Sequence, residues 1–213
     1  MSAPAPAVRR STWHRLLVIG APVGWIGAVL LHPSASPESV YADLSRSADR
    51  WLFVHFAQLA LTLALGAALW IAVSGRKGLA ATITRVAAPV YLVFFSAFDS
   101  VAGIASGLAL RHARSLSGGE LDGASSTVDY LLMNHMAGDA SPLSAISTIA
   151  LTSAVVGLAM TLRSAGASRL VWMGTFGGVL LNFHGAGPIP AVGLVAFTAA
   201  LLVADRRGHI LEV

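Results

Sequence analysis

Cysteine is absent from the 213-residue sequence, and charged residues make up only 11% of it. The first absence excludes disulfides, thiolate metal ligands and cysteine nucleophiles. The second is far below the roughly 25% of charged residues found in soluble domains. With 55% hydrophobic residues and a mean hydropathy of +0.72, a soluble globule would expose much apolar surface to water. We therefore expect an integral membrane protein.

Lysine and long basic runs are also scarce. Lys77 is the one lysine among fourteen basic residues, a usage typical of GC-rich bacterial genes. No basic run is longer than Arg9-Arg10, so the net charge of +4 does not indicate nucleic-acid binding. We expect the lipid bilayer, and no nucleic acid, as a partner of this chain.

Long apolar stretches are what the chain has in abundance. The clearest, Trp51–Val73, carries no formal charge, and at 1.5 Å per residue it is long enough for a bilayer core of about 30 Å. The pattern predicts an all-α, polytopic membrane protein with six transmembrane helices at residues 16–31, 51–73, 86–110, 142–162, 170–184 and 188–204. These helices would form one domain over residues 16–204, between flexible tails at 1–15 and 205–213.

The first apolar stretch has a second interpretation. Basic residues followed by an apolar run are also typical of a signal peptide. The segment where cleavage could occur is followed at once by Pro37, and the run is long for a signal peptide. We therefore favour an uncleaved first span.

Two short helices are predicted outside the spans. Ser36, Pro37 and Glu38 form a typical helix start, with an N-cap, a proline at the first position and an acid in the first turn. In the long loop 111–141, a capping box at Ser126–Asp129 begins an amphipathic pattern that continues through Val128, Leu131, Leu132, His135 and Met136. We expect this second helix to lie on the membrane surface or to roof the bundle.

The charges test this segmentation. Six spans place both termini on one side, and that side then holds ten of the fourteen basic residues: Arg9, Arg10, Arg15, Arg76, Lys77, Arg85, Arg163, Arg169, Arg206 and Arg207. The other side holds seven acids: Glu38, Asp43, Asp49, Glu120, Asp122, Asp129 and Asp139. The positive-inside rule therefore predicts a multi-pass protein of the plasma (inner) membrane with both termini in the cytoplasm.

Polar residues interrupt several spans near the same end. His55 and Gln58 share a face of the second span with Trp51, and Asp99 lies in the third, by residue count near mid-bilayer. Because such residues are costly in lipid, they usually face the bundle interior. We predict an extracytoplasmic-facing pocket lined by His55, Gln58, Asp99, Asn182 and His184, with His32 and the helix around His135 at its mouth.

The first hypothesis is that this pocket binds a small amphipathic or lipophilic ligand or a cofactor, and that the protein is a membrane-embedded enzyme. Asp99 and His55 would be the catalytic acid/base pair, and the ligand would be bound by Gln58, Asn182, His184 and Trp51. The second hypothesis is a non-catalytic partner subunit of another membrane protein, or a small-solute transporter. In that case the polar residues would serve helix packing.

A haem- or metal-binding redox protein is a third hypothesis. His55 and His184 could ligate a haem iron from two spans, or a divalent metal with His32 or His135 added. The pattern is weak, because no two histidines are spaced three or four residues apart on one helix and there is no HExxH motif. Hydrogen bonding of these side chains between helices is the simpler interpretation.

Overall fold

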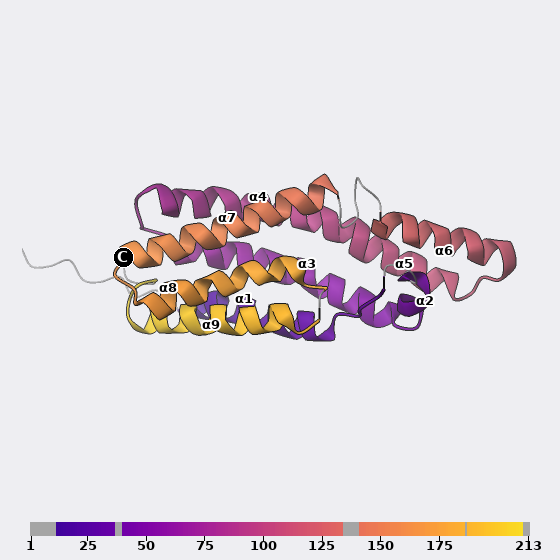
Figure 1. Ribbon diagram of the computed structural model, residues 1–213, viewed down its shortest axis with the longest axis horizontal. Coiled ribbons are helices and arrows are strands. Elements are labelled where there is room, and N and C mark those ends of the chain that lie inside the picture. Colours follow the sequence, from indigo (N-terminus) through magenta and orange to yellow (C-terminus); the bar gives the residue numbers. More distant parts are fainter. Residues whose placement is uncertain (1–11, 37–39, 134–140, 186, 211–213) are drawn as a thin grey trace, which may run out of the picture.

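A computed structural model describes residues 12–36, 40–133, 141–185 and 187–210, and every secondary-structure element within them is a helix (Figure 1). The all-α prediction is therefore confirmed. Five helices are long and apolar enough to cross a membrane: α1 (Thr12–Leu31), α3 (Ala48–Ala72), the continuous helix Leu79–Ala113, α7 (Pro142–Ser164) and α9 (Ile189–Arg206). This is the architecture of a multi-pass membrane protein.

The helix predicted at residues 170–184 has a different form. It consists of a short α-helix, α8 (Arg169–Thr175), followed by a 3₁₀-helix, η2 (Phe176–Phe183), and it is not among the five long apolar helices. Gly177 and Gly193 explain its course, because a side chain on either residue would meet the other's backbone. The two glycines let η2 pack directly against α9.

Small residues also bring α4 (Leu79–Phe98) and α7 together. A side chain at Gly157 would meet the backbone oxygen of Ala80. At the same contact, the Thr84 hydroxyl donates to the backbone oxygen of Ala154 on α7 at 3.1 Å. Close approach at small residues is the usual way for helices to associate in a membrane.

The helix Leu79–Ala113 is longer than the predicted span 86–110. It contains α4, a π-helix η1 (Asp99–Ala105) and α5 (Ser106–Ala113), 35 residues in all. At about 1.5 Å per residue it is roughly 50 Å long, well above the 30 Å or so of a bilayer core. One end of it therefore extends beyond the rest of the bundle (Figure 1).

A small second core forms where this helix extends. There α5 packs with α2 (Val40–Ser45), α6 (Gly118–Met133) and the start of α3, around the buried residues Val40, Leu44, Ala48, Trp51, Leu110 and Val128. Arg114 fixes the corner, with its Nη1 donating to Asp49 Oδ2 at 2.7 Å and its Nε to the Ser45 oxygen at 2.8 Å. We call this assembly the cap.

The two predicted short helices differ in detail from the structure. Helix α6 begins at Gly118, so the expected capping box at Ser126–Asp129 lies inside it. The reason is that the preceding residues continue the helical turn without a break. His135 and Met136 lie outside the described residues, as does Pro37. Helix α2 is described from Val40 to Ser45, and residues 37–39, next to the start expected at Ser36, lie outside the described residues.

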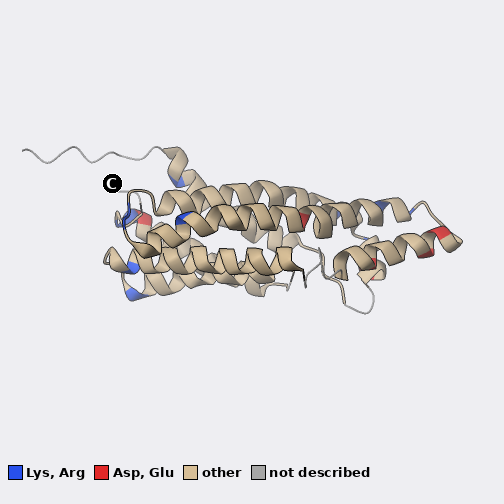
Figure 2. Cartoon of the chain, turned by 90° about the horizontal axis from the view of Figure 1, so that it is seen from above, with Lys and Arg blue, Asp and Glu red and all other residues tan. Residues whose placement is uncertain are grey.

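Basic residues gather at the opposite end of the molecule, where α9 finishes (Figure 2). Arg15 and Asp205 lie 3.5 Å apart there, between the start of α1 and the end of α9. Both residues are helical, so α1 begins inside the expected tail 1–15 and α9 ends inside the expected tail 205–213. We call this the terminal end of the bundle.

The glycine contact between η2 and α9 predicts the effect of a single methyl group. Gly193→Ala should lower the free energy of unfolding by about 1–3 kcal/mol, because the new carbon meets backbone that cannot turn aside. Gly20→Ala is the matched control, since nothing lies within 4 Å of a carbon built on that helical glycine. Thermal unfolding in detergent micelles measures both, and an equal Tm for the two variants would contradict this packing.

Candidate functional site

The centre of the candidate site is a buried pair formed by His55 and Asp99. His55 Nδ1 and Asp99 Oδ1 lie 2.6 Å apart, and the two side chains are 3% and 0% exposed. Because a carboxylate can only accept, the bond places the hydrogen on Nδ1 and leaves the lone pair on Nε2. Nε2 is buried and has no hydrogen-bond partner among the described residues. The pair therefore presents one unused imidazole nitrogen.

The π-helix η1 supplies the carboxylate of this pair. Asp99 is its first residue, directly after the last turn of α4. In a π-helix the turns are wider than in an α-helix, and such segments often occur at functional sites. Here the Gly103 oxygen accepts a hydrogen bond from Trp51 Nε1 at 2.7 Å, which ties η1 to α3.

Two glycines allow α3 to lie against this segment. A side chain at Gly103 would overlap the His55 ring and crowd Asp99 Oδ1, and one at Gly107 would meet Trp51 and Leu52. The first glycine is therefore a requirement of the His55–Asp99 pair. Trp51 completes the contact, because its ring lies 4.3 Å, centre to centre, from that of His55.

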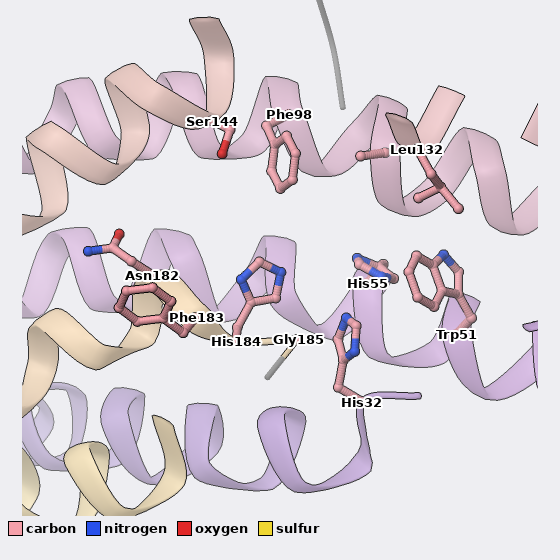
Figure 3. Close-up of a pocket in the computed structure, with 11 residues that line it drawn as sticks. His32, Trp51, His55, Phe98, Leu132, Ser144, Asn182, Phe183, His184 and Gly185 are labelled. Carbon is pink, nitrogen blue, oxygen red and sulfur yellow. The ribbon is translucent and has the colours of Figure 1, made fainter. Parts of the chain in front are cut away.

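Two further histidines join His55 at the same end of the bundle. His32 directly follows α1, and its ring centre lies 5.1 Å from that of His55 and 5.4 Å from that of His184. His184 directly follows η2 and also contacts Phe95, at 5.5 Å between ring centres. Figure 3 shows the three imidazoles converging on the same space. We call His32, His55 and His184 the histidine cluster.

The histidine cluster lines a cavity of about 360 Å³. Its apolar surface includes Trp51, Phe98 and Phe183, and Ser144 and Asn182 add polar groups (Figure 3). Ser144 lies in the first turn of α7, and two of the histidines follow helix ends. The cavity therefore lies at one end of the bundle, where the bundle meets the cap, and Asp99 is bonded to its wall.

The other predicted binding residues have different positions. Asn182 reaches the cavity and also donates to Thr152 Oγ1, at 3.1 Å, and to the Val179 oxygen, at 3.0 Å. Gln58 is fully buried on the α3 face that carries His55, but it does not line the cavity. The predicted place of His135 at the mouth lies outside the described residues.

Buried polar side chains near the site include three that the sequence prediction did not contain: Trp25, Thr62 and Tyr91. Within the described residues, no hydrogen-bond partner is found for either amide atom of Gln58, for Asp99 Oδ2 or for Trp25 Nε1, while the Thr62 and Tyr91 hydroxyls interact with each other. Each unsatisfied buried group costs about 1–3 kcal/mol. Thr62 continues the face of His55 and Gln58 at the spacing of one helical turn, and that spacing is the signal that could have found it.

The three histidines predicted as metal ligands, His32, His55 and His184, lie close together but are not placed around one ion. His32 contacts both of the other two rings, as the hypothesis of a shared ion requires. As they stand, however, no three or more His, Asp or Glu side chains in the described part of the chain are placed to hold a metal ion. The geometry favours acid/base chemistry by the His55–Asp99 pair over a metal site that is already formed.

Comparison with protein-family models, with curated proteins and with solved structures finds no match to this chain.

The contact at Gly103 yields a prediction about the pair. Gly103→Ala should separate the His55 ring from Asp99 and leave both buried groups without a partner, at a cost of about 1–3 kcal/mol for each group. Gly27→Ala, at a helical glycine with nothing within 4 Å, should leave stability unchanged or slightly raised. Thermal unfolding of the two variants side by side provides the measurement. Wild-type stability in Gly103→Ala would mean that the contact is not needed.

Proposed function

We propose that this protein is a membrane-embedded enzyme that binds a small amphipathic ligand in the cavity at the histidine cluster and acts on it by acid/base chemistry. The observation that carries this proposal is the His55–Asp99 bond, which leaves a buried Nε2 without a partner in the described structure, on a side chain that lines a cavity. Nothing in ordinary helix packing requires that arrangement.

The chemistry follows from the roles that the two side chains can take. Asp99 holds the imidazole in one orientation and one tautomer, and its negative charge stabilises the imidazolium that forms when Nε2 accepts a proton. Proton transfer by a positioned side chain contributes about 10²–10⁴-fold to a rate. Burial strengthens the electrostatic interaction, because the surroundings screen it less than water does.

The lining of the cavity supports an amphipathic ligand. Its volume of about 360 Å³ is in the range of small-molecule sites, about 300–1,000 Å³. Trp51, Phe98 and Phe183 offer aromatic surface for an apolar part. Asn182, Ser144 and His184 offer groups that could orient a polar head. A site between the apolar bundle and the polar cap suits a molecule that partitions to a membrane surface.

We also propose six crossings, with both termini in the cytoplasm of a bacterial cell and the cavity facing outwards. A 3₁₀-helix rises about 2.0 Å per residue, so α8 and η2 together are about 26 Å long, nearly a bilayer core. The gathering of basic residues at the terminal end (Figure 2) supports a cytoplasmic position for that end. The plasma membrane is the membrane that this orientation implies, and α6 would then lie on its outer surface.

A non-catalytic subunit or a small-solute transporter is the competing proposal, with the polar residues serving contacts between helices. The Asn182–Thr152 bond between η2 and α7 is of that kind. A haem held by His55 and His184 has less support, because His32 contacts both rings and would have to be displaced by the porphyrin.

The catalytic proposal is tested by comparing small-molecule and lipid extracts of cells that express the protein or its variants. Wild type should change the amount of at least one amphipathic compound relative to cells carrying an empty vector. His55→Gln should reduce that change by about 10²–10⁴-fold, because it removes the base. Asp99→Asn should reduce it by about tenfold or more, because it removes the charged partner of the base. His112→Gln, at an exposed position on α5, is the matched control and should keep full activity.

Two results would decide against catalysis. Identical extracts from wild-type and empty-vector cells would favour the subunit or transporter. A change in extract that survives in both His55→Gln and Asp99→Asn would place the chemistry elsewhere.

The absence of cysteine makes the topology directly measurable. Single cysteines at Ser117, Ser164 and Gly185, which are all exposed, can be labelled with a membrane-impermeant maleimide. Ser117→Cys and Gly185→Cys should react in intact cells, and Ser164→Cys only after permeabilisation. Labelling of Gly185→Cys only after permeabilisation would show that α8 and η2 do not cross the membrane.

A further inference from the structure

The two nitrogens of His32 have the same division of roles as those of His55. His32 Nδ1 lies 2.7 Å from the backbone oxygen of Pro33. A carbonyl oxygen can only accept, so Nδ1 carries the hydrogen and Nε2 of the neutral ring keeps its lone pair. Like Nε2 of His55, this atom is buried without a hydrogen-bond partner in the described part of the chain. Two neighbouring imidazoles therefore each present an unused lone pair.

Histidines that bind a metal show this pattern. They almost always donate their other ring N–H to a carboxylate or a backbone carbonyl, which fixes the tautomer and the ring orientation. Asp99 is such a carboxylate for His55, and the oxygen of Pro33 is such a carbonyl for His32. Neither arrangement is needed to pack two helices.

The spacing of the rings also fits a shared ion. Two imidazoles that bind one zinc ion tetrahedrally, with nitrogens about 2.0–2.1 Å from the metal, have ring centres roughly 5 Å apart. The observed separations are 5.1 Å between His32 and His55 and 5.4 Å between His32 and His184. Packing by van der Waals contact alone does not require histidine, yet three of the chain's seven histidines meet here.

We propose that the histidine cluster binds one divalent transition-metal ion, with Nε2 of His32, Nε2 of His55 and the ring of His184 as ligands. Imidazole ligands suit zinc, copper, iron and nickel, and three of them with one open position are typical of catalytic zinc. The open position would hold water, on the side of the cavity. The proposal rests on the proposed function, because it uses the same pocket, but it moves the proton transfer to another group. With Nε2 of His55 bound to the metal, a metal-bound water would replace that nitrogen as the base. Asp99 keeps its role of orienting His55.

One side chain has to move for the site to form. The described residues hold no set of three such side chains already placed around an ion, and of the other two histidines only His32 has a ring contact with His184. His184 lies after the end of η2, beside Gly185, and lines the cavity, so rotation about its side-chain bonds has space. Binding is therefore expected to pull His184 toward His32 and His55.

Metal content tests the proposal without any knowledge of the substrate. The full chain, purified without a polyhistidine tag, is equilibrated with zinc sulfate, washed and analysed by mass spectrometry for the metal. Wild type should retain about one zinc ion per chain. His32→Ala and His184→Ala should each lose it, and Asp99→Asn should bind about 10–100-fold more weakly. His112→Ala, at an exposed position outside the cluster, is the matched control and should retain the ion.

A second measurement separates loss of ligand from loss of fold. Cobalt in place of zinc should give the visible absorption bands of a four-coordinate ion in wild type and in His112→Ala. His32→Gln and His184→Gln, which keep a polar side chain, should lack those bands while eluting as folded protein in size-exclusion chromatography. Wild type that retains no more zinc than His32→Ala, or a His184→Gln variant with the wild-type cobalt spectrum, would overturn the proposal.

The two proposals fail in different ways. Zinc-free wild type with a product that still depends on His55 and Asp99 would overturn the metal site and leave the acid/base function in place. Stoichiometric zinc with no change in cell extracts would support the metal site and overturn the enzyme.

Discussion

The contact between the His55 imidazole and the Asp99 carboxylate constrains everything around it. Both groups are buried, and an unpaired carboxylate there would cost several kcal/mol. The contact is short enough only because Gly103 has no side chain, so α3 and η1 must meet at that residue. The Trp51–Gly103 bond and the wide turns of the π-helix then hold the approach in place. The polar pair and the local helix geometry therefore depend on each other.

The site lies at the level where several helices of the bundle end or begin. Helices α1 and η2 finish and α7 begins at this level, so their terminal residues can turn toward the pair: His32, His184 and Ser144 all do so. Only α3 and the helix Leu79–Ala113 continue, and their extensions form the base of the cap. A polar cavity is least costly at such a level, because water and backbone groups are available there to satisfy it.

Much of this arrangement could be predicted from the sequence, for an identifiable reason. Hydropathy indicates which segments are apolar helices. Because polar side chains are costly in lipid, His55, Asp99 and His184 could be expected to face the interior of the bundle and therefore one another. Hydropathy says nothing of the register of backbone hydrogen bonds, so the π-helix at Asp99 and the 3₁₀-helix at Phe176–Phe183 could not be foreseen. Tyr91 and Thr62 were missed because their side chains are common in apolar helices. The length of Leu79–Ala113 was missed because its ends are polar.

The tautomer of His55 tests the central claim most directly. In protein labelled with ¹⁵N-histidine, nuclear magnetic resonance should show one imidazole with its hydrogen on Nδ1 and a strongly deshielded proton shared with a carboxylate. That signal should disappear in His55→Gln and move to a less deshielded position in Asp99→Asn. A His55 ring that carries its hydrogen on Nε2 in the wild type, or a signal unchanged in Asp99→Asn, would contradict the account.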